Sequence, residues 1–240
     1  MPDPLRIFIG YDTKEPAALH VLMHSILRRA SIPVSITPIV QAQLRKAGVY
    51  TRDRGPTEST EFSMTRFLVP YLSSYHGYSL FMDCDMLCLT DVAEIMEHVR
   101  HNGSKDVWVC QHDYTPKDTV KFLGQPQTAY PRKNWSSFML FNCANQACRR
   151  LTPEYVNKAT GLELHRFKWC EDDRIGSLSL AWNHLVGEYE PAANAKILHY
   201  TLGGPWFEDY KESDHAKEWL SERDAMMQPG ASTLTLGTIR

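Results

Sequence analysis

The sequence predicts a single α/β domain built on an open, mixed but mostly parallel sheet that is flanked by helices. Short apolar segments alternate along the chain with segments of helical periodicity, which is the pattern of strands joined by crossover helices. Polar clusters directly follow several of the apolar segments, as they do at the carboxyl ends of parallel strands. At 240 residues with 43% hydrophobic residues, the chain can bury one sizeable core, and a second core is not needed.

The first 60 residues predict a strand, a helix, a second strand and a loop. Residues 5–10 form an apolar run that ends at a glycine. The apolar residues that follow repeat at helical spacing; they are Leu19, Leu22, Met23, Ile26 and Ala30. Residues 34–40 form a second apolar run, whereas residues 41–60 are polar and lack periodicity. We expect this last segment to be a loop or flap with a functional role.

The middle of the chain continues the alternation. The predicted elements are helices at residues 64–75, 92–99 and 153–159, strands at 78–82, 107–112 and 137–142, and a loop at 113–133. Thr152 and Pro153 form the N-cap and the first-turn proline of the third of these helices, which fixes where it begins.

The last third of the chain contains one more strand and a terminal helix. Asp172 and Asp173 open a segment whose apolar residues predict a helix. The remaining predicted elements are a strand at 196–201, a turn at 203–206, a charged helix at 213–227 and a frayed tail at 228–240. The chain is therefore expected to consist of a domain at 1–212 and a C-terminal helix with a tail at 213–240.

Charge and cysteine content exclude some classes of protein and partner. A formal net charge of −2 and a pI near 6.5 argue against a nucleic-acid-binding surface. The six cysteines contain no CxxC pair, and several lie inside apolar runs, so we expect reduced thiols and a cytoplasmic protein. No apolar run approaches the ~20 residues of a membrane span, and any membrane contact is expected to be peripheral. The oligomeric state stays open.

Asp83 and Asp85 are the strongest candidates for chemistry. They end the apolar run at residues 78–82, and residues i and i+2 of a strand project to the same side. Two carboxylates held this close repel each other unless a cation lies between them. Oxygen ligands suit a hard divalent ion such as Mn²⁺ or Mg²⁺, which in turn can hold a diphosphate. The alternative is that Asp85 only caps the next segment while Asp83 makes a surface hydrogen bond.

Three other polar clusters also follow predicted strands or open a helix. They are Tyr11 with Asp12, Asp172 with Asp173, and His199 with its glycine turn. His199 alone would be an ordinary structural histidine, but beside an Asp-x-Asp pair it is a candidate third ligand. The alternative for Asp172 and Asp173 is a solvated first helical turn. Convergence of these clusters would create one site at the carboxyl edge of the sheet.

Three segments resemble motifs of the family 8 retaining glycosyltransferases, which include glycogenin and bacterial lipooligosaccharide galactosyltransferases. The matching segments are Phe81-Met-Asp83-Cys-Asp85-Met-Leu87, Ser136-Ser137-Phe-Met-Leu-Phe-Asn142 and His199-Tyr-Thr-Leu-Gly203-Gly204-Pro205-Trp206. The resemblance spans most of residues 5–206 at the level of motifs. It implies the GT-A fold, which is a Rossmann-like sheet that binds a nucleotide sugar.

The resemblance also implies a role for each candidate residue. Asp83, Asp85 and His199 would bind Mn²⁺, and Asp83 would also approach the ribose of the donor. The other implied contacts of the donor, a UDP-sugar, are Tyr11 and Asp12 around the uracil, Arg66 nearby, and the backbone N–H groups of Gly203 and Gly204 on the diphosphate. Asp172, or its neighbour Asp173, would face the sugar.

This sequence departs from the family pattern at several positions. Trp135 and Ser137 stand where the family has Asn and Gly, and Gly204 replaces the lysine before Pro-Trp. The residue that follows the implied catalytic aspartate is not glutamine, so Asp172 and Asp173 compete for that role. These differences indicate a divergent member of the family.

The predicted function is metal-dependent transfer of a hexose from UDP-glucose or UDP-galactose to a glycan, lipid or protein. Retention of configuration is implied by the resemblance alone, and a front-face displacement and a covalent intermediate both stay open. A non-catalytic sugar-nucleotide-binding module is the first alternative. A sugar nucleotidyltransferase usually has a glycine-rich loop after the first strand, which Gly10-Tyr-Asp-Thr lacks. A phosphatase of the Asp-x-Asp type usually has Thr or Val at the position of Leu87.

Overall fold

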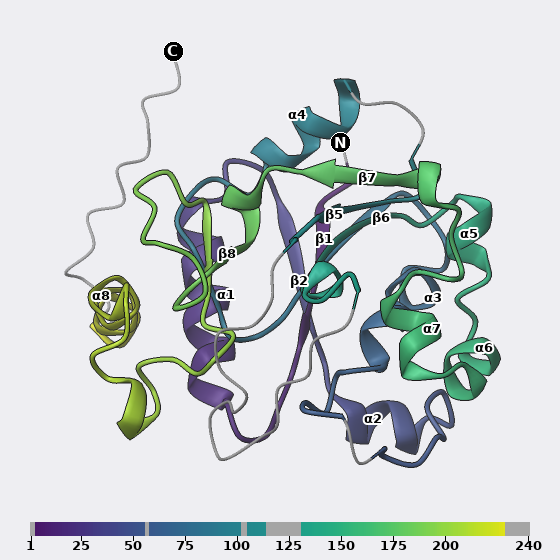
Figure 1. Cartoon of the computed structure of the whole chain (residues 1–240), viewed down its shortest axis with the longest axis horizontal. Coiled ribbons are helices and arrows are strands. Elements are labelled where there is room, and N and C mark those ends of the chain that lie inside the picture. Colours follow the sequence, from purple (N-terminus) through teal and green to yellow (C-terminus); the bar gives the residue numbers. More distant parts are fainter. Residues whose placement is uncertain (1–2, 56–57, 102–104, 114–130, 229–240) are drawn as a thin grey trace.

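A computed structural model describes residues 3–55, 58–101, 105–113 and 131–228 of the chain. Its centre is a six-stranded sheet with the order β2-β1-β3-β6-β5-β7 (Figure 1). The strands are β1 (Leu5–Gly10), β2 (Val34–Ile39), β3 (Tyr78–Met82), β5 (Val107–Cys110), β6 (Phe138–Asn142) and β7 (Ile175–Leu178). Most of the predicted loop at 113–133 and nearly all of the predicted tail at 228–240 lie outside the described residues.

The sheet is mixed and mostly parallel, as predicted. Strands β2, β1 and β3 are parallel to one another, β5 is parallel to β7, and β6 is antiparallel to both of its neighbours. Met82 at the end of β3 pairs with Phe138 at the start of β6, and Val109 near the end of β5 pairs with Met139. The carboxyl ends of β1, β2, β3, β5 and β7 therefore lie along one edge of the sheet, where open α/β folds place their ligand sites.

A second, three-stranded sheet lies at this carboxyl edge. Its order is β4-β9-β8, formed by β4 (Met86–Cys88), β9 (Ile197–His199) and β8 (His184–Leu185). Met86 pairs with His199 across the antiparallel β4–β9 ladder, and the Tyr200 N–H donates to the Asp85 carbonyl over 2.9 Å. This small sheet brings two segments more than 100 residues apart in the chain into one corner.

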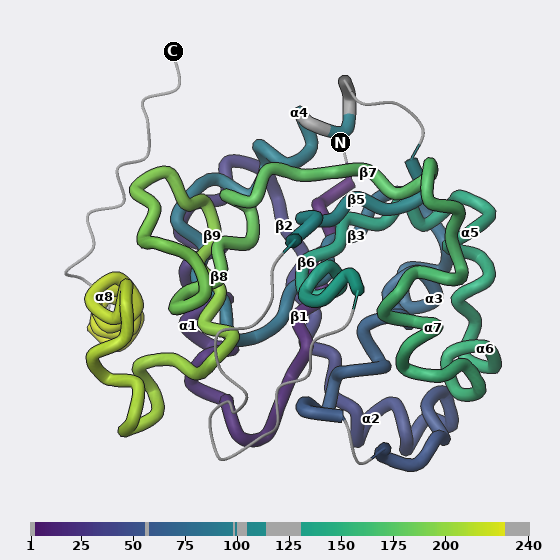
Figure 2. The backbone as a smooth tube through the Cα atoms, in the orientation of Figure 1, coloured from purple at the N-terminus to yellow at the C-terminus, as the bar shows by residue number. Residues whose placement is uncertain are grey.

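Helices cover both faces of the large sheet (Figure 2). They are α1 (Pro16–Arg29), α2 (Gln41–Lys46), α3 (Val69–Leu72), α4 (Glu94–His101), α5 (Gln146–Arg149), α6 (Pro153–Lys158), α7 (Gly161–His165) and α8 (Ala216–Met227). Helices α1 and α8 lie on one flank, and α3, α5, α6 and α7 lie on the other. The predicted stripe of α1 is confirmed, since Leu19, Leu22 and Ile26 are at most 4% exposed. Thr152 caps α6 by accepting a hydrogen bond from the Tyr155 N–H.

Two predicted elements differ from the structure in the first half of the chain. The segment 41–60 is not a simple loop, because it contains α2, and Asn157 of α6 accepts hydrogen bonds from the N–H groups of Thr51 and Arg52. The helix predicted at 64–75 is divided into a 3₁₀ turn, Thr65–Leu68, and α3. Pro70 lies at this division, and its missing N–H interrupts a continuous helical ladder.

The segment after Asp173 is a strand and not the predicted helix. Asp172–Arg174 forms one 3₁₀ turn, and Ile175–Leu178 is β7. A Cβ at Gly176 would lie only 2.3 Å from the Trp108 ring, so the glycine allows the strand to pack closely there. The apolar residues at 175 and 178 have helical spacing but serve a strand, because the pairing with β5 outweighs a weak local pattern.

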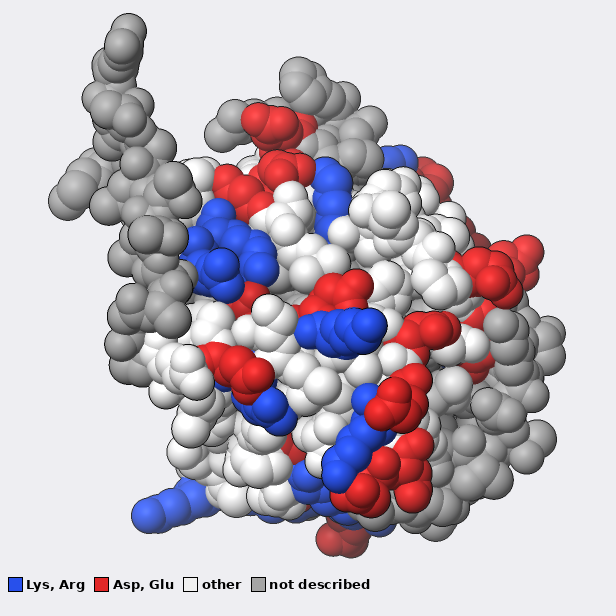
Figure 3. Space-filling view, turned by 90° about the vertical axis from the view of Figure 1, so that its left-hand side faces the viewer, with Lys and Arg blue, Asp and Glu red and all other residues white. Residues whose placement is uncertain are grey.

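The last helix packs onto the first. Trp219 of α8 is 1% exposed, and the buried Glu222 carboxylate contacts His24 over 2.6 Å and Arg29 over 2.8 Å on α1. On the side of the molecule that carries α8, acidic and basic side chains are interspersed and do not gather into a patch of one sign (Figure 3). The helix predicted at 213–227 is therefore present as α8, and it packs against α1.

All six cysteines are buried free thiols. In the described part of the chain, we find no helix with the length and hydrophobicity needed to cross a bilayer.

Candidate metal centre

Asp83, Asp85 and His199 form one buried cluster at the carboxyl edge of the sheet. One ligand atom from each residue lies within 4.8 Å of the other two, and the three residues are 8%, 8% and 2% exposed. The ladder between β3 and β6 continues to the Asp83 N–H, which donates to the Ser137 carbonyl over 3.0 Å. Asp85 directly precedes β4, whose first residue pairs with His199. The structure thus brings together the three residues for which the sequence predicted a metal site.

A chain of hydrogen bonds determines which nitrogen of His199 is free. The Ser137 hydroxyl donates to the Asn134 carbonyl over 2.7 Å, so its lone pairs accept from Asn183 Nδ2 over 2.9 Å. Asn183 Oδ1 then faces His199 Nδ1 at 2.9 Å. Because an amide oxygen only accepts, Nδ1 carries a hydrogen, and Nε2 is the nitrogen that can hold a cation when the ring is neutral.

This tautomer makes the cluster suitable for a cation. His199 Nε2 lies 3.3 Å from Asp85 Oδ1. In the neutral ring a nitrogen lone pair and a carboxylate oxygen face each other there, and either a proton on Nε2 or a cation between the two atoms offsets their repulsion. Two carboxylates and an imidazole held by an outer amide form a donor set that fits Mn²⁺ or a similar divalent ion.

Arg66 holds Asp83 in place. Its Nη1 lies 2.8 Å from Asp83 Oδ1 and donates to the Ser136 carbonyl over 2.9 Å. The guanidinium packs over the rings of Phe62 and Phe81, at 5.1 and 5.0 Å from their centroids. The sequence predicted that Arg66 lies near the donor, and this stays a prediction; in the structure, Arg66 pairs with a carboxylate of the centre. It offsets part of the repulsion between the aspartates.

Asp12 shapes the loop after β1. It is 1% exposed, and its two carboxylate oxygens accept hydrogen bonds from the N–H groups of Lys14 and Glu61 over 2.9 and 3.0 Å. Tyr11 is half-buried against the core. Both residues lie at the carboxyl edge, as predicted, but the Asp12 oxygens already hold backbone groups that position the loop.

The glycine turn after His199 is shaped by aromatic rings. Gly203 has φ 135°, and a Cβ there would lie 2.8 Å from the Tyr210 ring; a Cβ at Gly204 would lie 2.1 Å from the Trp206 ring. The Gly203 N–H donates to the Tyr200 carbonyl over 2.9 Å. The predicted contact of the Gly203 N–H with a diphosphate does not fit this geometry, because that N–H already closes the turn.

Asp172 and Asp173 are not part of this centre. They directly precede β7, and Ile175 at its start pairs with Val107 at the start of β5, which places both aspartates at the amino edge of the sheet. The Asp172 side chain is 77% exposed and forms an ion pair with Arg132 over 2.7 Å; Arg132 lowers the pKa of this carboxyl. The predicted role of these aspartates at the sugar stays a prediction, and their place at the amino edge argues against it.

Sequence reasoning missed Asn183 and Glu15. Asn183 follows Trp182 in an unremarkable segment, and only the fold shows that it orients His199. Glu15 is 1% exposed; burial first, and then the charges of Asp85 and Asp12, raise the pKa of its carboxyl to about 9. Its place three residues after Asp12 was a usable signal, but an acidic residue before a helix is normally interpreted as a cap.

Two histidines near the centre, the buried His112 and the half-buried His165, are neutral. Burial, followed by the charges of His199 and His184, lowers the pKa of His112 to about 3, and Tyr189 OH lies 2.8 Å from its Nδ1. Burial, together with nearby Arg66, lowers the pKa of His165 to about 3, and its Nδ1 lies 2.7 Å from Ser136 Oγ. The surroundings of the cluster therefore contribute polar groups without additional positive charge.

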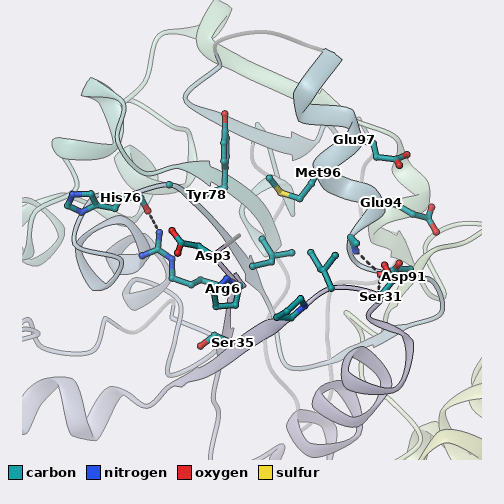
Figure 4. Close-up of a pocket in the computed structure, with 16 residues that line it drawn as sticks. Asp3, Arg6, Ser31, Ser35, His76, Tyr78, Asp91, Glu94, Met96 and Glu97 are labelled. Atoms are coloured by element: carbon teal, nitrogen blue, oxygen red, sulfur yellow. Dashed lines mark hydrogen bonds between the residues drawn. The ribbon is translucent and has the colours of Figure 1, made fainter. Parts of the chain in front are cut away.

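A separate cavity of about 820 Å³ lies at the opposite edge of the sheet. It is lined by the amino ends of β1, β2 and β3 and by α4, with Arg6, Tyr78 and Met96 among its residues (Figure 4). Arg6 donates to the carbonyls of Ser73 and His76 at its wall. None of the predicted site residues lines this cavity.

Solved glycosyltransferases have the same fold as this chain. It matches glycosyltransferase GlyE of Streptococcus pneumoniae TIGR4 with a TM-score of 0.61 and 14% identity, over 92% of this chain and 60% of that chain. It matches galactosyltransferase LgtC, solved with donor and acceptor sugar analogues, with a TM-score of 0.57 and 10% identity, over 93% of this chain and 97% of that chain. The fold of this chain is therefore the GT-A fold of glycosyltransferases.

A closer relative is found by sequence. The chain is 50% identical over 226 residues to Protein CDI of Arabidopsis thaliana. The aligned region covers 92% of this chain and 86% of that protein. The chain belongs to the Protein CDI family. No family model matches the sequence.

Proposed function

We propose that this protein is a metal-dependent glycosyltransferase that moves a hexose from UDP-glucose or UDP-galactose to a glycan, lipid or protein acceptor, with retention of configuration. The observation that carries the proposal is the buried cluster of Asp83, Asp85 and His199, whose ligand atoms lie within 4.8 Å of one another at the carboxyl edge of a GT-A sheet. Buried carboxylates this close together destabilise the folded protein unless a cation offsets their repulsion, so their presence favours a functional role.

Each residue of the centre has a definite role in this proposal. Asp83, Asp85 and the Nε2 atom of His199 would hold the cation, whose charge would stabilise the diphosphate leaving group. Asn183 keeps the Nε2 lone pair available through its contact with Nδ1, and Arg66 keeps Asp83 oriented through its 2.8 Å ion pair. Tyr11 and the loop held by Asp12 would contact the nucleoside, and Gly204 would approach the diphosphate.

One observation favours a second candidate, a sugar-nucleotide-binding module that does not transfer the sugar. Asp172 and Asp173 lie at the opposite edge of the sheet from the metal centre, so the implied carboxylate for the sugar is missing from the place where the resemblance puts it. A transferase without that carboxylate must rely on the metal centre and on the orientation of substrates.

The two candidates differ in turnover and share donor binding. Calorimetry of UDP, UDP-glucose and UDP-galactose with Mn²⁺, and separately with EDTA, should show binding only when Mn²⁺ is present. A coupled assay for free UDP, run with and without a library of acceptor glycans, should show turnover for a transferase. Binding without UDP release under all conditions would support the module. Mn²⁺-independent binding, or no binding, would contradict the metal centre itself.

A further inference from the structure

We propose that the cavity at the amino edge of the large sheet is a second ligand site, which takes a small organic cation with an apolar body, such as an aryl-alkyl ammonium ion. The cavity lies at the opposite edge from the proposed metal centre, and none of the predicted site residues lines it. The inference goes beyond the proposed function and does not depend on it.

The cavity has the size and the walls of a small-molecule site. Its volume is about 820 Å³, which falls within the range of about 300–1,000 Å³ that is common for ligand pockets. The amino ends of β1, β2 and β3 form one side of it, and the start of α4 forms another (Figure 4). Regular elements therefore hold its shape, as expected of a preformed ligand site.

Large apolar side chains provide part of the lining. Ile32 is 37% exposed, and Tyr78 and Met96 are half-buried. Apolar side chains that meet at one hollow and stay open to solvent are typical of a binding surface. The face of the Tyr78 ring can also attract a cation, and the flexible Met96 side chain can adapt to the shape of a ligand.

The charged groups of the lining are mostly negative. Among the described residues that line the cavity are four carboxylates and one guanidinium, which give a formal charge of −3, whereas the whole chain carries only −2. The carboxylates belong to Asp3, Asp91, Glu94 and Glu97, and the guanidinium belongs to Arg6. A hollow with an excess of one sign concentrates ions of the opposite sign, so the charge of the lining favours a cation as the occupant.

Two of the four carboxylates already have partners. Asp91 Oδ1 accepts from two backbone N–H groups over 2.9 and 3.2 Å, and Glu94 Oε2 lies 2.6 Å from Lys196 Nζ. The carboxylates of the exposed Asp3 and Glu97 are therefore the ones that a ligand cation can approach. The helix dipole favours acidic residues at the start of α4, but it does not account for Asp3, which precedes β1.

Arg6 has a structural task at the wall of the cavity. Its two terminal nitrogens each donate to a backbone carbonyl, Nη1 to that of Ser73 over 2.9 Å and Nη2 to that of His76. These bonds fix the guanidinium against the turn that leads into β3. Its positive charge therefore holds the protein chain, and it offsets only part of the negative charge of the lining.

The polar and apolar groups of the lining are arranged for an elongated cation. Figure 4 shows Arg6 on one side of the cavity and Glu97 of α4 on the other, with Tyr78 and Met96 between them. The charged end of the ligand would lie at Glu97, and its apolar body would lie along Tyr78 and Met96. The charge would thus be recognised at one end of the cavity and the apolar body in the middle.

Three probes with the same apolar body separate the effect of charge from that of size. They are phenethylammonium, the neutral phenethyl alcohol and the anionic hydrocinnamate, each titrated into the full chain with EDTA present so that no metal takes part. The methyl signals of Ile32 and Met96 in NMR spectra of methyl-labelled protein report binding in the cavity. The ammonium ion should bind with a dissociation constant of about 1 mM or lower and about tenfold more tightly than the alcohol. The carboxylate should not reach saturation.

The variant Glu97→Gln tests the charged end of the cavity. It removes one exposed charge and keeps the shape of the side chain, so binding of the ammonium ion should weaken about three- to fivefold and binding of the alcohol should not change. Glu212→Gln is the matched control, because Glu212 is also exposed and does not line the cavity. It should bind all three probes as the wild type does.

The variant Ser35→Phe tests the space itself. Ser35 of β2 is exposed and lines the cavity, and an aromatic side chain is compatible with a strand, so the melting temperature should stay at the wild-type value while the ring blocks the ligand. Binding of the ammonium ion should be lost. The inference is overturned by equal affinity for the three probes, by tighter binding of the carboxylate, or by methyl signals of Ile32 and Met96 that do not move. Wild-type affinity for the ammonium ion in Glu97→Gln or in Ser35→Phe overturns it as well.

Discussion

Two acidic pairs of this protein, Asp83 with Asp85 and Asp172 with Asp173, lie in very different surroundings. The side chains of Asp83 and Asp85 are each 12% exposed, whereas that of Asp172 is 77% exposed. Asp83 is held by the buried Arg66, and Asp172 is paired with Arg132 at the surface. Water screens the second pair and not the first, so a charge interaction is worth several times more at the carboxyl edge than at the amino edge.

This difference shows that burial and the position along the sheet decide what an acidic pair can do. The first pair ends a strand, and the second precedes one. Only the first pair can therefore reach the edge where the ligand sites of α/β sheets lie. Variants of the two pairs test whether they differ in function as strongly as they differ in environment.

The largest difference is expected between the variants Asp85→Asn and Asp172→Asn. The first change removes a proposed metal ligand from a buried cluster, and Mn²⁺ affinity should fall by a hundredfold or more. The second change alters an exposed ion pair, so Mn²⁺ affinity and donor-dependent UDP release should stay within about threefold of wild type. Calorimetry and the UDP assay measure both. A hundredfold loss of turnover in Asp172→Asn would restore its predicted catalytic role.

A smaller effect is expected for Asn183→Leu. Without the amide oxygen, His199 can place its hydrogen on Nε2, and Mn²⁺ affinity should fall about 10–100-fold. Asn145→Leu is the control at the amino edge, where the Asn145 amide donates to Asp106 over 2.8 Å. It should cost stability and leave Mn²⁺ affinity intact. Equal losses of affinity in the two variants would mean that general loosening, and not the tautomer, controls the centre.

The smallest effect is expected for the pH dependence of the free energy of unfolding that His165 contributes. Its pKa of about 3 in the folded protein lies below the ordinary value of about 6.5, so the folded state binds fewer protons than the unfolded state. Stability is therefore fully present above pH 6.5 and is lost as pH falls toward 3, by up to about 2 kcal/mol at pH 5. Urea unfolding of wild type and His165→Asn at pH 7.5 and pH 5 measures this. Parallel losses in both proteins would assign the effect to other groups.

The sequence predicted the strands of the large sheet and the meeting of Asp83, Asp85 and His199, for a physical reason. Apolar runs report burial on both faces of a parallel strand, and Asp83 and Asp85 stand where such a run ends. His199 was identified because a motif accompanied it. These signals are local. In open α/β sheets, the carboxyl ends of the parallel strands lie along one edge, so residues that follow different strands can be expected to meet there.

The sequence could not predict partnerships that depend on the path of the chain. The resemblance placed Asp172 or Asp173 at the sugar, and the apolar spacing predicted a helix after them. Here β7 begins at Ile175, so the aspartates stay at the amino edge. The contacts of Asn183 with His199, and of Arg66 with Asp83, join residues 16 and 17 positions apart through the fold, and no periodicity records them.

The contact between α1 and α8 also has a consequence for how the protein is made. His24 and Glu222 are 198 positions apart, so they meet only after nearly all of the described chain has been synthesised. Such a long closure is formed late and contributes to a slow folding step. Tyr200, whose hydroxyl donates to the His215 carbonyl at the start of α8 over 2.8 Å, directly follows His199. Because β4 directly follows Asp85 and pairs with β9, Asp85 and His199 take up their places in the small sheet together, after the chain has been synthesised at least as far as His199.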